Sequence, residues 1–339
     1  MGHRRASAVR RHLAALGAVA LAAAPGCAQD PPVAGRGQSG PLVVTSVSPI
    51  TNVAANIAGA GARVVGLVPE GENAHEFEPP PRTARTLSDA RLVFVNGLNL
   101  EISLEGLAAK TAGRDRIVRL GDRTIPRSER IFDFSFPESK GDPNPHAWTN
   151  PPYVKRYART IATELSKADP GRRDDYERNL AAFEQRTGEL DAAVRAASAT
   201  LSPERRTLLT YHDSFPYFAR DYGWTVVGAV QPSDFSEPSP RELAALVDQV
   251  RERRVGAIFG SEVFPSPVLE RIARESGARY VDALRDDDLP GRPGDPGHSW
   301  FGLMQFNLVT IVEALGGDAS ALKSLDVSDV VDNRAEYPQ

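Results

Sequence analysis

The sequence predicts an α/β protein with two (β/α)4-like lobes, each containing a parallel sheet, joined by a long rigid helix. Short valine-rich runs alternate with helical patterns in two separate parts of the chain, which is typical of parallel sheets covered on both faces. A proline-free stretch of helical character, residues 171–202, separates those two parts. The length of 339 residues also suits two domains better than one.

The N-terminus has the pattern of an export signal, residues 1–26. A basic segment precedes an apolar run, 13–24, which is shorter than the roughly 20 residues that cross a bilayer. Cys27, the only cysteine, follows in Ala24-Pro25-Gly26-Cys27, which resembles the lipobox of a bacterial lipoprotein and predicts lipidation there. The alternative is a conventional signal peptide with an incidental cysteine. Both interpretations predict an extracytoplasmic protein, in the periplasm or at the outer face of the cell membrane, without an internal disulfide.

Residues 27–40 follow the predicted signal. They are rich in Gln, Pro and Gly and predict a flexible tether.

The net charge narrows the possible partners. The formal charge of the whole chain is -4, and removal of the signal takes away four arginines, which leaves about -8. This mildly acidic balance argues against a nucleic acid as partner.

The first predicted lobe covers residues 41–168. Its apolar runs are nearly continuous, as expected for strands buried on both faces. Residues 131–150 form a loop that begins with Phe132, Phe134 and Phe136 and has a polar middle. We expect strands at 42–47, 63–68, 91–96 and 116–120, and helices at 51–60, 82–90, 101–110 and 151–168.

Residues 169–202 predict the connecting helix. Asp169 is suited to cap a helix that begins at Pro170, where the missing N–H costs nothing. Charged side chains occupy the opposite face, so the helix is expected to bury one stripe along its whole length. The stripe recurs in steps of four and three, at Tyr176, Leu180, Phe183, Thr187, Leu190, Val194, Ala197 and Leu201.

The second predicted lobe covers residues 203–339 and repeats the alternation of the first. No sequence repeat of 20–50 residues is evident, so the protein is not a solenoid. We expect strands at 206–210, 224–230, 256–260 and 279–283, and helices at 214–221, 241–254, 267–276 and 300–315.

Three histidines stand where a strand or its following segment gives way to a loop: His75, His146 and His212. The carboxyl ends of parallel strands meet at one edge of a sheet, where ligands bind in open α/β folds. Any one of them is more often a structural histidine than a metal ligand, but their shared placement favours a metal site. His298 lies in a glycine-rich loop and is expected to be a bystander.

Several segments in order along the chain resemble one family: the metal-binding solute receptors of bacterial ABC importers, the cluster A-I or TroA-like superfamily, of the zinc-receptor type. The resemblance implies two lobes around one metal, with His75 and His146 from the first lobe and His212 and Asp282 from the second. The matching segments are Gly71 to Pro79, Asn96-Gly97 with Glu101, Pro145-His146-Ala147-Trp148 with Pro151, Tyr211-His212-Asp213-Ser214-Phe215, Ser236 to Pro240, and Met304 to Asn307.

The carboxylate of this ligand set has competitors. Asp282 is expected at the carboxyl end of the eighth strand, where the fold places ligands. Asp286 to Asp288 compete with it, although three consecutive acids in a loop are usually solvated. Glu262 is a candidate partner that orients a ligand histidine, with a simple helix cap as the alternative.

Three imidazoles and one carboxylate form a borderline donor set that suits Zn²⁺. Manganese receptors of the family tend to have a carboxylate where His212 stands, so Mn²⁺ is the alternative. Zinc receptors often carry a long His-rich loop in the first lobe, whereas residues 120–145 contain no histidine.

The predicted function is therefore an extracytoplasmic, high-affinity Zn²⁺ receptor that captures the ion between two lobes and delivers it to an ABC permease. We expect a monomer with a membrane lipid anchor and a possible metallochaperone partner, and no enzymatic activity. A manganese or iron receptor of the same family is the first alternative. A secreted zinc hydrolase is disfavoured because the chain has no His-Glu-x-x-His and the aspartate closes the coordination. A surface adhesin would differ by binding a macromolecule independently of metal.

Overall fold

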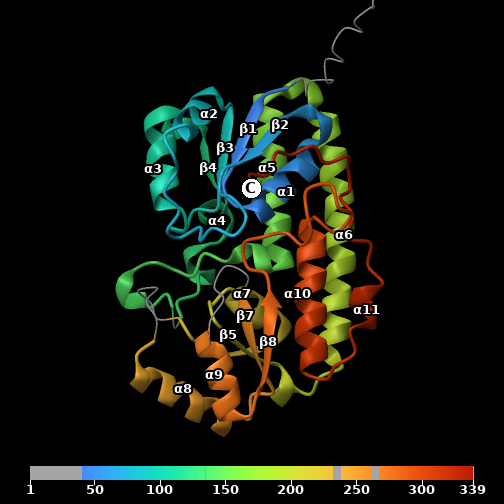
Figure 1. Ribbon diagram of the computed structural model, residues 1–339. Coiled ribbons are helices and arrows are strands. Elements are labelled where there is room, and N and C mark those ends of the chain that lie inside the picture. The colour runs from blue at the N-terminus through green and yellow to red at the C-terminus, as the bar shows by residue number, and fades with distance from the viewer. Residues whose placement is uncertain (1–39, 134, 232–237, 262–266, 339) are drawn as a thin grey trace, which may run out of the picture. The chain divides into compact units, whose positions relative to one another are not determined.

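The computed structural model describes residues 40–133, 135–231, 238–261 and 267–338. These residues contain two four-stranded sheets, and every strand pair is parallel (Figure 1). The predicted fold class is confirmed. The predicted signal peptide, most of the tether, Cys27 and Glu262 lie outside the described residues.

The first sheet has the strand order β2-β1-β3-β4, and its strands are near-continuous apolar runs. All four residues of β3 are buried, as expected for a strand of a parallel sheet that is covered on both faces. Every residue of α1 is buried too, because this helix packs against α5, α6 and α10. The strands are β1 (Leu42–Thr45), β2 (Arg63–Gly66), β3 (Leu92–Val95) and β4 (Ile117–Arg119). The helices are α1 (Ser48–Ala58), α2 (Thr83–Asp89), α3 (Ile102–Thr111), α4 (Leu120–Thr124) and α5 (Pro151–Ala168).

The connecting helix α6 spans Arg173–Ala199. It contacts α1 and α5 of the first lobe and α7, α10 and α11 of the second, so it supports both (Figure 1). The predicted stripe is buried except for Leu180, which is partly buried. Asp169 makes no side-chain cap hydrogen bond, and a short 3-10 turn at Pro170–Arg172 precedes the α-helix. The predicted cap is therefore wrong, although the predicted helix forms.

The second sheet repeats the order of the first, as β6-β5-β7-β8. The core that fills the first lobe continues along α6 and α10 into this lobe. A separate, smaller core lies between the sheet and helices α8 and α9, and includes Val227, Val247, Leu269 and Ile272. The strands are β5 (Thr207–Thr210), β6 (Thr225–Ala229), β7 (Ala257–Ser261) and β8 (Arg279–Leu284). The helices are α7 (Pro216–Tyr222), α8 (Pro240–Glu252), α9 (Pro267–Ser276), α10 (Trp300–Ala314) and α11 (Ser320–Lys323).

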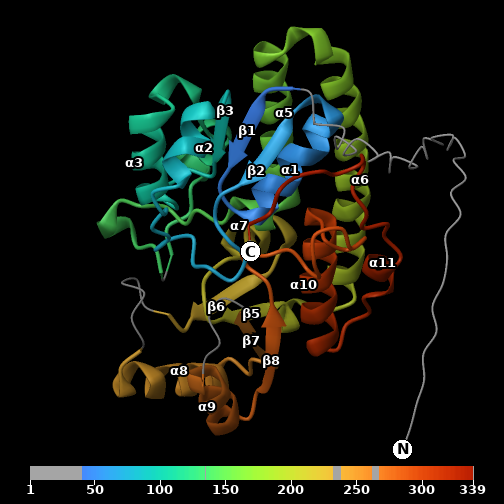
Figure 2. The ribbon, with the colours of Figure 1, turned by 45° about the horizontal axis from the view of Figure 1, so that its top comes forward.

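The C-terminal segment, residues 329–338, returns to the first lobe. The backbone N–H of Gly66 donates to the carbonyl of Glu336 at 2.9 Å, and the N–H of Glu336 donates to the carbonyl of Val64 at 2.9 Å. The carboxylate of Glu336 also pairs with Arg63. Figure 2 shows this segment, in red, passing from α11 to β2. The sequence division at residue 203 thus leaves one piece of the second range in contact with the first lobe.

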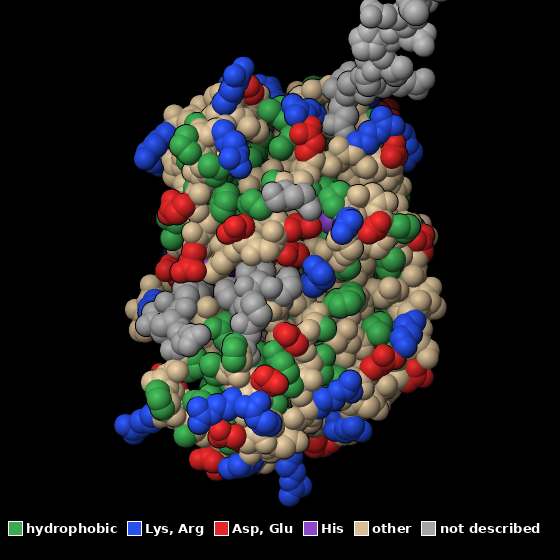
Figure 3. Space-filling view, viewed as in Figure 1, with side chains coloured by type: hydrophobic (Ala, Val, Ile, Leu, Met, Phe, Trp, Pro, Cys, Tyr) green, Lys and Arg blue, Asp and Glu red, His purple; other side chains and the backbone are tan. Residues whose placement is uncertain are grey.

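Charged side chains of both signs are mixed over the face drawn in Figure 3, and basic side chains, all arginines, gather near α8 and α9. Arg251, Arg271 and Arg274 there pair with acidic side chains of the same helices, which balances much of the local charge. In the part of the chain that the structure describes, no helix is both long enough and apolar enough to span a bilayer.

Candidate metal centre

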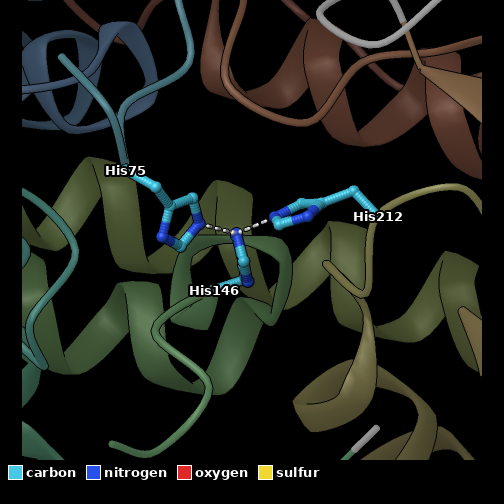
Figure 4. A group of neighbouring side chains, drawn as sticks. All are labelled: His75, His146 and His212. Atoms are coloured by element: carbon cyan, nitrogen blue, oxygen red, sulfur yellow. Dashed lines mark hydrogen bonds between the residues drawn. The ribbon is translucent and has the colours of Figure 1, made fainter. Parts of the chain in front are cut away.

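The structure brings His75, His146 and His212 together (Figure 4). The Nε2 atom of His146 lies 3.2 Å from Nε2 of His75 and 2.7 Å from Nε2 of His212. One ligand nitrogen from each ring falls within 4.8 Å of the other two. His146 and His212 are buried, and His75 is half-buried. Three residues from distant parts of the sequence therefore converge on one point.

The segment before α5 is fixed over the carboxyl end of β3. The side-chain amide of Asn96, the residue after β3, donates to the carbonyl of Pro145 at 2.9 Å. The buried carboxylate of Glu101 accepts from the backbone N–H groups of Asn96 and Gly97 at 2.7 and 3.2 Å. Burial raises the pKa of Glu101 to about 7. This chain of contacts sets the position of His146, which follows Pro145.

Asn144 determines which nitrogen of His146 faces the site. Its Oδ1 accepts from the backbone N–H of His146 at 2.9 Å and lies 2.8 Å from the ring Nδ1. Its Nδ2 donates to the Asp133 carboxylate at 2.8 Å and to the carbonyl of Asp213 at 2.7 Å, which fixes the orientation of the amide. The ring Nδ1 of His146 therefore carries the proton, and Nε2 presents a lone pair to the site.

Gln231 holds His212 in the same way, from the other lobe. The Nδ1 of His212 lies 2.9 Å from Oε1 of Gln231 and donates to it. The Nε2 atoms of both buried rings then lack protons, and two lone pairs face each other at 2.7 Å. Such an arrangement is repulsive unless the two nitrogens share a proton or a metal ion. The unprotonated Nε2 atoms are therefore suited to hold a metal ion.

The three histidines are neutral around pH 7. Burial lowers the pKa of His75 and His146 well below the ordinary value of 6.5, and the neighbouring rings lower it further. Burial also lowers the pKa of His212, although the charge of Asp286 and the hydrogen bond to Gln231 oppose that shift. Neutral imidazoles are the form that binds metal.

The structure does not bring Asp282 to the histidines. Its side chain is exposed and accepts a hydrogen bond from the hydroxyl of Tyr280 on the same strand. Asp286 is only 2% exposed, and its charge acts on the His212 ring. Asp282 belongs to the body of the edge strand β8, which ends at Leu284, whereas Asp286 lies in the loop beyond it. The structure therefore separates Asp282 from the three histidines, and the loop after the strand offers Asp286 as the candidate carboxylate.

Asp286 is held from both lobes. Ser214, two residues after His212, donates its hydroxyl to Oδ1 of Asp286 at 2.6 Å. Trp148, two residues after His146, donates its indole N–H to the Asp286 carbonyl at 2.8 Å. Asn307 of α10 binds the main chain of Arg285, the residue before Asp286. Its side-chain amide accepts from the N–H of Arg285 at 2.9 Å and donates to the Arg285 carbonyl at 2.7 Å. These hydrogen bonds fix the conformation of the loop that contains Asp286.

Sequence reasoning placed Asp286 only among the carboxylates that compete with Asp282, and it missed Asn144 and Gln231. The signal for Asp286 was available, because the three histidines all lie beyond strand ends and the carboxylate follows the same rule. The two amides carried no signal, since their role depends on tertiary contacts. His298 lies outside the histidine group, and its Nδ1 donates to the carbonyl of Pro290 at 3.2 Å.

Comparison with known proteins places the chain in a family. The family described as "ZnuA: Zinc-uptake complex component A periplasmic" matches residues 43–314. The "Zinc-binding protein TroA" of Treponema pallidum is 31% identical over 279 residues, which are 81% of this chain and 89% of that protein. The "Manganese-binding lipoprotein MntA" of Halalkalibacterium halodurans is 30% identical over 297 residues, 88% of this chain and 95% of that protein.

Solved structures agree with the sequence matches. The structure of the periplasmic zinc-binding protein TroA from Treponema pallidum superposes with a TM-score of 0.73 and 28% identity, covering 81% of this chain and 99% of that one. A further sequence relative, the "Iron-binding protein YfeA" of Yersinia pestis, is 28% identical over 275 residues, which are 81% of this chain and 86% of that protein. The chain therefore belongs to the ZnuA family, cluster A-I, of metal-binding periplasmic solute-binding proteins.

Proposed function

We propose that this protein is an extracytoplasmic Zn²⁺ receptor that captures one ion between its lobes and delivers it to an ABC permease. The proposed ligands are His75, His146, His212 and Asp286. The observation that carries the proposal is the convergence of the three imidazole nitrogens, two of them on rings whose Nδ1–H donates to a side-chain amide. Asp286 supplies the negative charge beside His212.

Zinc is proposed over manganese and iron on the chemistry of the donors. Three imidazoles and one carboxylate suit a closed, four-coordinate Zn²⁺ site, whereas Mn²⁺ prefers more oxygen ligands. A manganese or iron receptor is the second candidate, because similar proteins are named for manganese in Halalkalibacterium halodurans and for iron in Yersinia pestis. The two candidates differ in the rank order of metal affinities, which competition measurements give directly.

The proposed mechanism is binding to a largely preformed site. The buried rings are neutral and their outer nitrogens are tied to amides, so capture costs little reorientation or proton release. The long helix α6 contacts both lobes and restricts their relative motion to small tilts. Release then requires the permease to displace a ligand loop, and the loop of Asp286 is the candidate because two of its bonds come from the segments that carry His146 and His212.

The cellular setting is also a proposal. We infer export by residues 1–26, lipidation at Cys27 and a flexible tether that ends near residue 40. The mature protein would act as a monomer beside its permease, with or without a metallochaperone as the source of zinc. Replacing Cys27 by Ser is expected to release the protein from the membrane fraction into the soluble extracytoplasmic fraction. Continued membrane association of that variant would contradict lipidation.

The test of the function is equilibrium zinc binding by the purified chain from Gln29 onward, measured by competition with a chromophoric chelator. We expect one tight site per chain. His146→Ala and Asp286→Ala should each weaken binding beyond the roughly 100-fold that loss of an outer partner costs. Asp282→Ala is the matched control and should bind like the unmodified protein. Tight one-to-one binding retained in His146→Ala would remove this histidine from the ligand set.

A further inference from the structure

Phe136 lies against all three imidazoles of the metal centre. Its ring is stacked on His75 with centroids 5.5 Å apart and an interplanar angle of 30°. Its edge contacts with His146 and His212 have centroid distances of 5.8 and 6.4 Å. Phe136 is 8% exposed although it lies in the long loop between α4 and α5. The hydrophobic beginning of that loop therefore has a place in the site.

The backbone around Phe136 is fastened to the two residues that orient the histidines, to Asn144 through Asp133 and to the main chain of Gln231. The N–H of Phe136 donates to the Asp133 carboxylate at 3.1 Å, and the N–H of Asp133 donates to the Phe136 carbonyl at 2.9 Å. The other oxygen of Asp133 accepts from Asn144. The hydroxyl of Ser135 donates to the backbone carbonyl of Gln231 at 3.3 Å. The aromatic ring is thus positioned by both lobes.

A pocket of about 160 Å³ reaches the site at this place. Both Phe136 and His75 line it, together with Leu98 and Ile102, and Ile102 is 65% exposed. The two rings therefore lie where the metal centre meets a solvent-accessible pocket. A phenyl ring cannot coordinate an ion or hydrogen-bond to its water, so it keeps solvent away from whatever the histidines hold.

We propose that Phe136 is a positioning and specificity-determining residue. It holds the His75 ring in place and keeps water out of the coordination sphere, which favours a four-coordinate ion over one that keeps water ligands. The physical reason is that Zn²⁺ is satisfied by four protein ligands, whereas Mn²⁺ retains additional oxygen ligands. The inference rests on the proposed metal receptor function and adds a residue that selects the metal and slows its exit.

The experiment uses Co²⁺ as a probe, because its visible absorption is intense in four-coordinate sites and weak in sites that add water. Phe136→Ala, Phe136→Leu and the unmodified protein are loaded with Co²⁺, and zinc dissociation into an excess of chelator is timed. Phe132→Ala is the matched control, since Phe132 is in the same loop and 36% exposed. Near-ultraviolet circular dichroism checks that each variant is folded.

We expect Phe136→Ala to lose absorption intensity, to release zinc faster, and to lose roughly 10- to 100-fold in zinc affinity with a smaller loss for Mn²⁺. Phe136→Leu should keep most of the absorption, because an apolar side chain still excludes water. An unchanged cobalt spectrum and zinc release rate in Phe136→Ala would overturn the inference. Failure of the unmodified protein to bind zinc or cobalt would instead overturn the proposed function, so the two failures are distinguishable.

Discussion

The two lobes share one strand order but are anchored differently. In the first lobe, β3 and α1 are completely buried, and the edge strand β2 is covered by the C-terminal segment through Glu336. In the second lobe, only one of the six residues of the edge strand β8 is buried. The first lobe belongs to the main core, whereas α8 and α9 pack on a separate, smaller core. The same topology therefore gives a rigid support on one side and a less anchored outer layer on the other.

The proposed metal ligands of the second lobe are also fastened to the first lobe. The hydroxyl of Thr149 donates to the Ser214 carbonyl at 2.8 Å, and Trp148 holds the Asp286 loop. These bonds tie the ligand segments of the second lobe to the segment before α5. The comparison teaches that the proposed site is stabilised by bonds across the lobes as well as by the smaller core, which includes Tyr211 and Val230 beside His212 and Gln231.

The largest effect is expected from substitutions that weaken each hydrophobic core in turn, which test whether the two lobes are anchored differently. Leu104 of α3 belongs to the main core and Leu269 of α9 to the smaller one, and both are 0% exposed. Each Leu→Ala change should cost about 2–5 kcal/mol, because it leaves a cavity. We expect Leu104→Ala to lower global stability, whereas Leu269→Ala should accelerate hydrogen exchange mainly in α8 and α9. Equal acceleration throughout the chain in both variants would mean that the two cores unfold as one unit.

The next prediction concerns the C-terminal segment. The Asp329 carboxylate accepts from the side-chain amides of Asn52 and Asn56 at 2.9 and 2.7 Å, and both asparagines are fully buried. Asp329→Ala removes one buried acceptor from each amide and should cost about 2–3 kcal/mol of unfolding free energy in chemical denaturation. Asp332→Ala is the control, because Asp332 is exposed and pairs with the nearby Arg334; it should change stability by less than about 0.5 kcal/mol. Equal losses of unfolding free energy in the two variants would show that the C-terminal segment does not stabilise the first lobe.

A third prediction compares the two amides that orient the ligands. Removing an outer partner of a ligand histidine typically weakens metal binding roughly 10- to 100-fold. Asn144→Ala should lie at the upper end and Gln231→Ala lower, because Asn144 also bonds Asp133 and the backbone of Asp213. Gln185→Ala, an exposed amide on α6, serves as control. Zinc affinities that match the control in both variants would contradict the assigned orientation of the rings.

The smallest effect is expected in proton release. The pKa values of His75, His146 and His212 are lowered by burial, so protons compete with zinc only when the pH falls through those lowered values. Zinc affinity should therefore change little between pH 7 and the ordinary histidine value of 6.5, and it should decline only as the pH falls further, through the lowered pKa values. Calorimetry in buffers of different ionisation enthalpy should detect almost no proton release at pH 7. Release of a full proton or more would show that the free site binds protons.

Local pattern predicted most of the fold. The helix at 151–168 forms with the predicted bounds, and all eight predicted strands appear, because continuous apolar runs and proline positions are local signals. The buried stripe of α6 followed from its spacing. The return of the C-terminal segment could not be predicted this way. Pairing of Glu336 with Val65 joins residues far apart in a sequence that reads as a polar tail.

One physical rule predicted the three histidines of the candidate site but not its carboxylate. The rule that ligands lie beyond the carboxyl ends of strands located His75, His146 and His212. It was not applied strictly to the carboxylate, because consecutive acids in a loop are usually solvated. Here residues Asp286, Asp287 and Asp288 are each at most 5% exposed, since the loop is folded back under bonds from Trp148 and Ser214. That burial is a tertiary effect, invisible in the local pattern.

The central claim is that one ion bridges the lobes through three imidazoles and one carboxylate. The most direct measurement is a crystal structure of the zinc-loaded mature chain, with the ion located by anomalous diffraction at the zinc edge. We predict a single strong peak bonded at about 2.0–2.2 Å to Nε2 of His75, His146 and His212 and to a carboxylate oxygen of Asp286. A peak elsewhere, or one that lacks the ligands of either lobe, would contradict the account.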